Sequence, residues 1–146
     1  MLPLLDSWQR WSRELTTVVA LTDDDDISVI SEYPWPALLI RSRSAKAGER
    51  LFQHLYAAMP CHEDETEPMM NIVAWRKGDE FLSVVFPRAK HRPDCYGDIV
   101  VSPGAIDMAG LIITPREEDF RQLTEEVAVN LLREVSLSKE AFSKVI

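Results

Sequence analysis

Four potentially cationic side chains lie close together in the middle of a strongly acidic chain. They are Arg88, Lys90, His91 and Arg92, between Pro87 and Pro93. The 146-residue chain has a formal net charge of -8, so this local excess of positive charge is unlike its surroundings. Arginine offers a planar fork to phosphate oxygens, lysine offers a mobile point charge, and the prolines restrict the loop backbone. The loop predicts an anion site, with phosphate as the expected anion. A solvated surface loop is the alternative.

A run of small residues from Ser102 to Gly110 follows this loop and contains one acid, Asp107. Small side chains let backbone N–H groups approach phosphate or ribose closely, and Asp107 is a candidate to orient a ribose hydroxyl or a cation. The glycine spacing fits neither a Walker loop nor a dinucleotide-binding fingerprint. A tight connection between two strands, in which Asp107 only caps a turn, therefore remains an open interpretation.

Metal binding is a weaker alternative. The candidate zinc ligands are Cys61, His62, His91 and Cys95. Structural zinc sites usually present paired cysteines about two to four residues apart, and this chain has no such pair. We therefore predict no metal, no cofactor and two free thiols. The chain also lacks the Gly-x-Ser-x-Gly motif of a serine nucleophile.

Composition excludes several classes of protein. A chain with 46% hydrophobic and 27% charged residues is typical of a soluble globular domain. No apolar run approaches the roughly 20 residues of a membrane span, and the N-terminus does not resemble a signal peptide, so no membrane partner is expected. A sequence pI near 4.9 argues against a nucleic-acid-binding surface. The cytoplasm is the expected location.

The hydrophobic pattern predicts a single α+β domain over residues 1–146, in which a mainly antiparallel sheet has helices packed on one face. Expected strands are 15–21, 27–30, 37–41, 69–75, 81–86, 99–102 and 111–114, and the apolar start Met1–Leu5 also suits a strand. Expected helices are a turn at 8–11, a helix from Ser44 to Pro60, a turn at 116–120, and helices capped by Thr124 and Ser138.

The middle of the chain resembles a known family. The matching residues are Asn71-Ile72, Phe86-Pro87-Arg88 and the segment Val101–Gly110. They resemble the C-terminal domain of the ATP adenylyltransferase and GDP-L-galactose phosphorylase group in the histidine-triad superfamily, and most of all its bacterial, Bacteroides-type branch. The resemblance covers residues 69–120 well, and earlier segments only by the order of their elements.

The resemblance implies a domain without catalytic residues. Relatives cleave or form nucleoside phosphoanhydrides through a nucleotidyl-histidine, and the nucleophile lies in a His-x-His-x-Gln motif of an upstream domain. This chain has no such motif. The resemblance therefore implies a histidine-triad-like C-terminal half of a nucleotidyltransferase or phosphorylase. Its partner would be a missing N-terminal histidine-triad domain, and its ligand a nucleotide or sugar nucleotide. Because Met1-Leu2-Pro3-Leu4 resembles the segment after that motif, we expect a longer two-domain parent protein.

Eight residues are the candidate phosphate- or nucleotide-binding residues. Asn71, Arg88, Ser102 and Gly110 match the family pattern, whereas Lys90, His91, Arg92 and Asp107 rest on local charge and turn chemistry. The alternative function is a standalone binding or scaffold module without enzymatic activity. Such a module could form a homodimer that buries exposed sheet edges.

Overall fold

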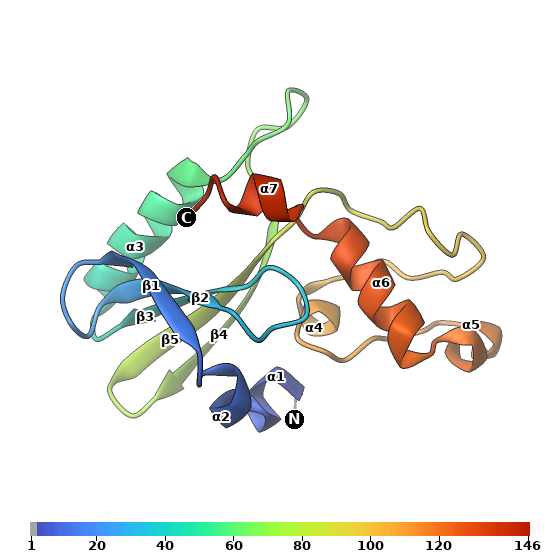
Figure 1. The fold of residues 1–146 in the computed structure, drawn as a ribbon, viewed down its shortest axis with the longest axis horizontal. Coiled ribbons are helices and arrows are strands. Elements are labelled where there is room, and N and C mark those ends of the chain that lie inside the picture. The colour runs from blue at the N-terminus through green and yellow to red at the C-terminus, as the bar shows by residue number, and fades with distance from the viewer. Residues whose placement is uncertain (1–2) are drawn as a thin grey trace.

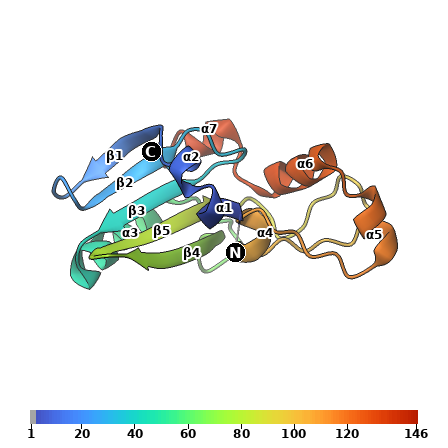
Figure 2. The ribbon, with the colours of Figure 1, turned by 90° about the horizontal axis from the view of Figure 1, so that it is seen from below.

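The computed structural model describes residues 3–146 and contains one five-stranded sheet in which all neighbouring strands are antiparallel (Figure 1). The strands are β1 (Leu15–Ala20), β2 (Asp26–Ile30), β3 (Leu38–Ser42), β4 (Met70–Lys77) and β5 (Glu80–Pro87). Their spatial order is β1-β2-β3-β5-β4, so β1 and β4 form the two edges (Figure 2). The predicted α+β class with a mainly antiparallel sheet is confirmed.

Three of the helices begin directly after a serine or threonine that caps them. The helices are α1 (Pro3–Asp6), α2 (Trp8–Trp11), α3 (Ala45–Ala58), α4 (Ala105–Met108), α5 (Glu117–Gln122), α6 (Glu125–Val135) and α7 (Lys139–Phe142). The side chains of Ser44, Thr124 and Ser138 each accept a hydrogen bond from a backbone N–H of the first turn that follows. Among the described residues, no helix has the length and apolar content needed to cross a membrane.

Apolar side chains alternate between the two faces of the sheet along β3, which gives each face its own core. Leu39 joins a cluster that α1, α2, α4 and α6 complete. Leu38 and Ile40 join a second cluster on the other face, which α3 completes and against which Phe142 of α7 packs. The helical cover predicted for one face thus extends to both, because a strand that is apolar at successive positions needs cover on each side.

Aromatic rings fill the first of these cores. The ring of Tyr33 lies 4.9 Å from Trp11, 5.2 Å from Trp35 and 5.5 Å from Phe86 between centroids. Its hydroxyl donates to the carbonyl of Met108 in α4 at 2.9 Å, and burial raises its pKa. Phe86 directly precedes the cationic loop, so this aromatic cluster fixes the start of that loop.

Two predicted strands do not form. Residues 99–102 and 111–114 are irregular, and α4 lies between them. Ile99 and Val101 bury against Leu131 of α6 without pairing, and the backbone N–H of Ile113 donates to the carboxylate of Asp107 at 3.2 Å. Side-chain burial and a local hydrogen bond therefore replace a β-ladder in this connection.

The predicted strand at Met1–Leu5 falls partly outside the described residues. Pro3–Asp6 forms the helix α1, in which Leu4 is buried. The backbone N–H of Leu4 donates to the carbonyl of Ala109 at 3.0 Å, so this segment docks beside α4 and does not join the sheet. The strand prediction is wrong for these residues.

Candidate functional site

Arg88 is the centre of the predicted anion site, yet it is buried, with 4% of its surface exposed. An arginine side chain has five N–H donors, and here each of the five is engaged. The acceptors are the side-chain oxygen of Asn71 and the backbone carbonyls of Lys90, His91, Pro103 and Val135. Arg88 therefore ties the end of β5 to β4, to the cationic loop, to the segment before α4 and to the end of α6.

The charge of Arg88 is held by neutral oxygens and one carboxylate at longer range. Burial lowers the pKa of the guanidinium, and the negative charge of Asp107 opposes that shift. Asp107 is itself buried and accepts from the backbone N–H of Gly104 at 2.8 Å. With all its donors engaged, Arg88 has no free N–H for a phosphate, so the geometry suits a positioning residue and not the predicted phosphate fork.

The segment from Ser102 to Gly110 forms the other side of this arrangement. Ser102 is exposed beside Pro103, whose carbonyl accepts from Arg88 at 2.8 Å. Gly110 ends α4 with a φ of 95°, and an added Cβ would lie 3.1 Å from the Cβ of Pro3. The glycine is therefore required by the turn after α4 and by its close approach to α1, with no ligand needed to explain it.

Lys90 is neutralised within the chain. Its ammonium group lies 2.7 Å from the carboxylate of Asp94 and also contacts Glu134 of α6. Glu134 accepts from the backbone N–H groups of Asp94 and Cys95 at 2.7 and 2.9 Å. Hydrogen bonds from the Cys95 thiol, from Lys90 and from these backbone groups lower the pKa of Glu134 to about 2. Burial and the nearby Glu134 raise the pKa of the Cys95 thiol to about 11, so this thiol is a poor nucleophile at neutral pH.

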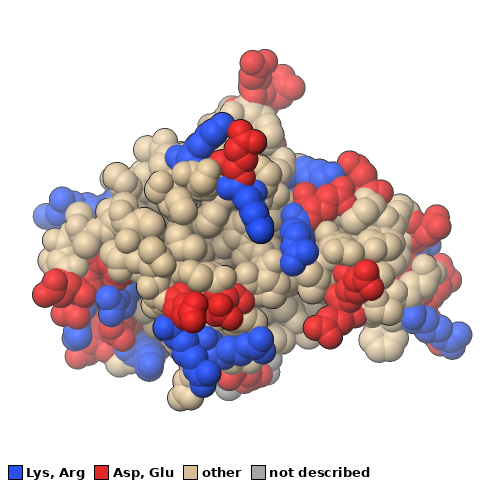
Figure 3. Space-filling model, viewed as in Figure 1, with Lys and Arg blue, Asp and Glu red and all other residues tan. Residues whose placement is uncertain are grey.

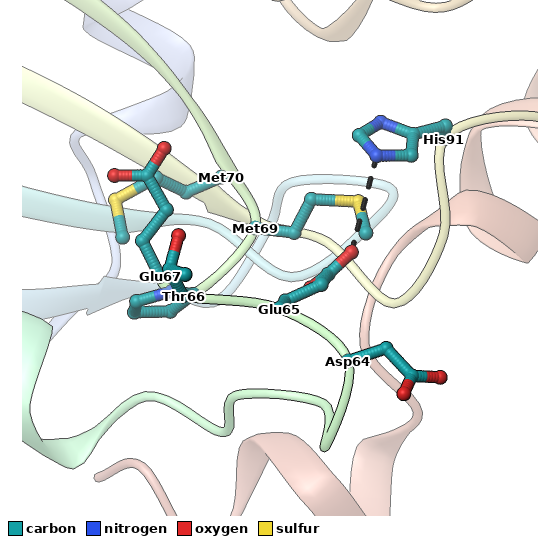
Figure 4. Close-up of a pocket in the computed structure, with 8 residues that line it drawn as sticks. Asp64, Glu65, Thr66, Glu67, Met69, Met70 and His91 are labelled. Atoms are coloured by element: carbon teal, nitrogen blue, oxygen red, sulfur yellow. Dashed lines mark ion pairs between the residues drawn. The ribbon is translucent and has the colours of Figure 1, made fainter.

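The two remaining candidate residues of the loop, His91 and Arg92, are exposed, and we call them the cationic tip. His91 lies beside a concavity of about 470 Å³, whose wall contains three acids, Asp64, Glu65 and Glu67. Figure 4 shows His91 and Glu65 facing each other across it, with His91 Nε2 3.9 Å from Glu65 Oε1. Figure 3 shows acidic and basic side chains interspersed over one face of the molecule, without a broad basic area.

The zinc alternative finds no support in the geometry. His62 uses Nε2 to contact the carbonyl of Ala89 at 3.0 Å, and Cys61 donates to the carbonyl of Glu65 at 3.2 Å. Within residues 3–146, no three His, Cys, Asp or Glu side chains are grouped so that they could hold a metal ion. Both cysteines are free thiols in the structure.

The structure thus gathers half of the candidate residues around one guanidinium. Asn71 and Arg88 are in direct contact, and the backbone of Lys90 and His91 is held by the same side chain. The residue that sequence reasoning missed is Glu134. It lies on the polar side of an amphipathic helix, 44 positions from Lys90, and no local sequence pattern distinguishes it from the other surface acids of α6.

Glu134→Gln is expected to destabilise the chain by about 1–2 kcal/mol at pH 7, because a neutral amide accepts more weakly than a carboxylate. The folded pKa of Glu134 is depressed from 4.5 to about 2, so its stabilising effect is complete above about pH 4.5 and is lost as pH falls through about 2. Denaturant unfolding at pH 7, 4 and 2.5 should show the difference from the wild type shrinking. Glu126→Gln, on the exposed surface of the same helix, is the control. A difference that stays constant with pH would contradict the assignment.

Comparison with known proteins identifies a family. A family model described as "GDPGP1-like, C-terminal domain" matches residues 12–146, which include all five strands, α3 and every residue of the candidate site. Comparisons with curated proteins and with solved structures give no significant match.

Proposed function

Because this chain belongs to the GDPGP1-like C-terminal domain family, we propose that it is the non-catalytic half of a nucleotidyltransferase- or phosphorylase-like protein and contributes to a nucleotide or sugar-phosphate pocket. The family match supports the relation to the C-terminal domain of GDP-L-galactose phosphorylase. Placement in the histidine-triad superfamily and in a Bacteroides-type branch remains a prediction from the resemblance. The existence of a partner, an N-terminal domain that supplies the histidine nucleophile, is also a prediction from the resemblance.

The observation that carries the binding part of the proposal is the support of the cationic tip by Arg88. The guanidinium donates to the carbonyls of Lys90 and His91, both at 2.9 Å. These bonds hold the loop backbone while the side chains of His91 and Arg92 stay exposed. Because the loop backbone is already ordered, phosphate binding causes a smaller loss of conformational entropy than binding to a flexible loop would.

Electrostatics limits what the chain can bind alone. Asp64, Glu65 and Glu67 lie on the same concavity as His91 and oppose an anion there. Lys90 is already paired with two carboxylates. The tip therefore supplies one side of a phosphate site, and we propose that the partner domain supplies further donors along with the nucleophile.

The isolated chain is expected to show no turnover of GDP-hexose with inorganic phosphate, and none of nucleoside polyphosphates. Its only histidines are His54, His62 and His91, so it lacks the paired histidines of the family nucleophile motif. Chromatographic separation of nucleotides after long incubation with purified chain is the measurement. Release of GDP or hexose phosphate above a heat-denatured control would overturn the non-catalytic part of the proposal.

A second candidate function is favoured by a specific observation, the position of β4 at one edge of the sheet. A standalone binding or scaffold module that works as a homodimer would use that edge. The expected cytoplasmic location suits either candidate and remains a prediction.

A further inference from the structure

One edge of the sheet, the outer side of β4, offers a regular row of backbone groups. The backbone N–H of Arg88 donates to the carbonyl of Met69 at 2.9 Å, and the register of β4 with β5 continues unbroken from Met70 to Lys77. Because hydrogen-bonded pairs alternate in an antiparallel ladder, the odd-numbered residues of β4 face β5. The residues that direct N–H and C=O groups away from the sheet are Met70, Ile72, Ala74 and Arg76.

The two edges of the sheet differ in how they are protected. At the other edge, β1 has an irregular register between Thr17 and Val19, which twists a strand away from flat pairing. β4 is longer, with eight residues, and contains neither an irregularity nor a proline. Among residues 3–146 no strand pairs with the outer side of β4. Figure 2 shows β4 at this edge of the sheet. β4 is thus the edge that is open to another strand.

Charge is distributed unevenly along this strand. Asp64, Glu65 and Glu67 precede it, and Arg76 and Lys77 end it. A strand that follows an acidic segment and ends in basic residues is complementary to an antiparallel copy of itself, since each basic end then meets the acidic segment of the other copy. The segment has the self-complementarity that a twofold-symmetric interface requires.

We propose that two copies of this chain associate by antiparallel pairing of their β4 strands. Pairing centred on Ile72 places its outward backbone groups opposite those of the second copy and sets Lys77 opposite Glu67. Both Lys77 and Glu67 are exposed in the single chain. The acidic concavity beside Glu67 then lies within reach of the basic end of the partner strand.

An apolar groove next to β4 is a second observation in favour of pairing with another copy of the chain. It lies between α3 and the sheet and is lined by Phe52, Ile72 and Phe81 among other residues. The two strand residues remain 38% and 40% exposed, respectively. A strand added beside β4 extends the floor of this groove and covers Ile72, so one partner satisfies both the free backbone groups and the exposed apolar surface. The β4 dimer rests on the second candidate function, which it makes specific, and it uses no residue of the cationic tip.

Sedimentation equilibrium of the purified chain over a range of concentrations tests the proposal. The expected result is a monomer–dimer equilibrium with a Kd on the order of 10 μM, as suits a small interface. Lys77→Glu and Glu67→Lys should each raise this Kd about tenfold, because the symmetric contact occurs twice and each change sets like charges opposite one another. The double variant Glu67→Lys/Lys77→Glu should return the Kd to within about threefold of the wild type.

Two further variants separate the edge from other surfaces. Ala74→Pro removes an outward N–H without removing a bond to β5, and it should abolish dimerisation while circular dichroism shows a folded chain. Arg121→Glu, on the exposed surface of α5, changes the charge equally and should leave the Kd unchanged. A chain that is monomeric at millimolar concentration would overturn the proposal, and so would a dimer that tolerates Ala74→Pro or is not rescued by the double charge exchange.

Discussion

Replacing Arg88 with methionine is expected to destabilise the domain by about 3–5 kcal/mol, because buried hydrogen-bond acceptors lose a charged donor and a buried carboxylate loses its nearby cation. The acceptors come from β4, from the cationic loop, from the segment before α4 and from α6. The carboxylate is that of Asp107. Denaturant unfolding followed by tryptophan fluorescence measures the loss.

Two matched variants show whether the role of Arg88 is structural. Arg88→Lys keeps the charge but has three donors where arginine has five, so it should recover only part of the stability. Arg92→Met removes an exposed cation four positions along the chain and should change stability by less than about 0.5 kcal/mol. A stable Arg88→Met chain that has lost only affinity for phosphate would show instead that Arg88 is a direct ligand.

Replacing Phe86 with alanine is expected to cost about 3–5 kcal/mol. Phe86 is fully buried, and its ring packs 5.5 Å from that of Tyr33 in the aromatic core. It also precedes Pro87 and Arg88, so the cavity left by its removal would loosen the residue that organises the candidate site. The midpoint of thermal or denaturant unfolding measures the effect.

Phe81 provides the matched control for this variant. It is the same residue type on the same strand, β5, but its side chain faces the groove beside α3 and is 40% exposed. Phe81→Ala should therefore cost about 1 kcal/mol or less. Equal effects of the two substitutions, measured at a concentration where the chain is monomeric, would contradict the location of the core described for β5.

Local signals in the sequence were sufficient for much of the fold. Ser44, Thr124 and Ser138 cap helices as predicted, because a short polar side chain before an apolar period satisfies the free N–H groups of a first turn. The β4–β5 hairpin turns at Gly78, whose φ of 59° suits glycine. Short apolar segments also located the other three strands to within a residue or two.

The errors have a common physical origin in contacts between distant residues. Residues 99–102 have strand-like composition, but the side chains of Ile99 and Val101 are buried against α6 and the segment pairs with no strand. Asp26 is the last of four consecutive aspartates, a pattern typical of a solvated turn, yet it is buried at the start of β2, where it pairs with Arg41 at 2.8 Å. The partners of Arg88 lie up to 47 positions away in the chain. No local sequence pattern distinguishes an arginine that donates to buried carbonyls from an arginine that binds phosphate.

A nuclear magnetic resonance titration of the isotope-labelled chain with GDP tests the central claim most directly. Contacts from two exposed side chains, opposed by nearby carboxylates, predict binding with a Kd on the order of 1 mM. The expected shifts are confined to the backbone amides of 89–92, Ser102 and Gly104, and Arg92→Ser abolishes them without changing stability. Amides of 89–92 that stay unmoved at about 10 mM GDP, ten times the expected Kd, or shifts that survive Arg92→Ser, would contradict the account.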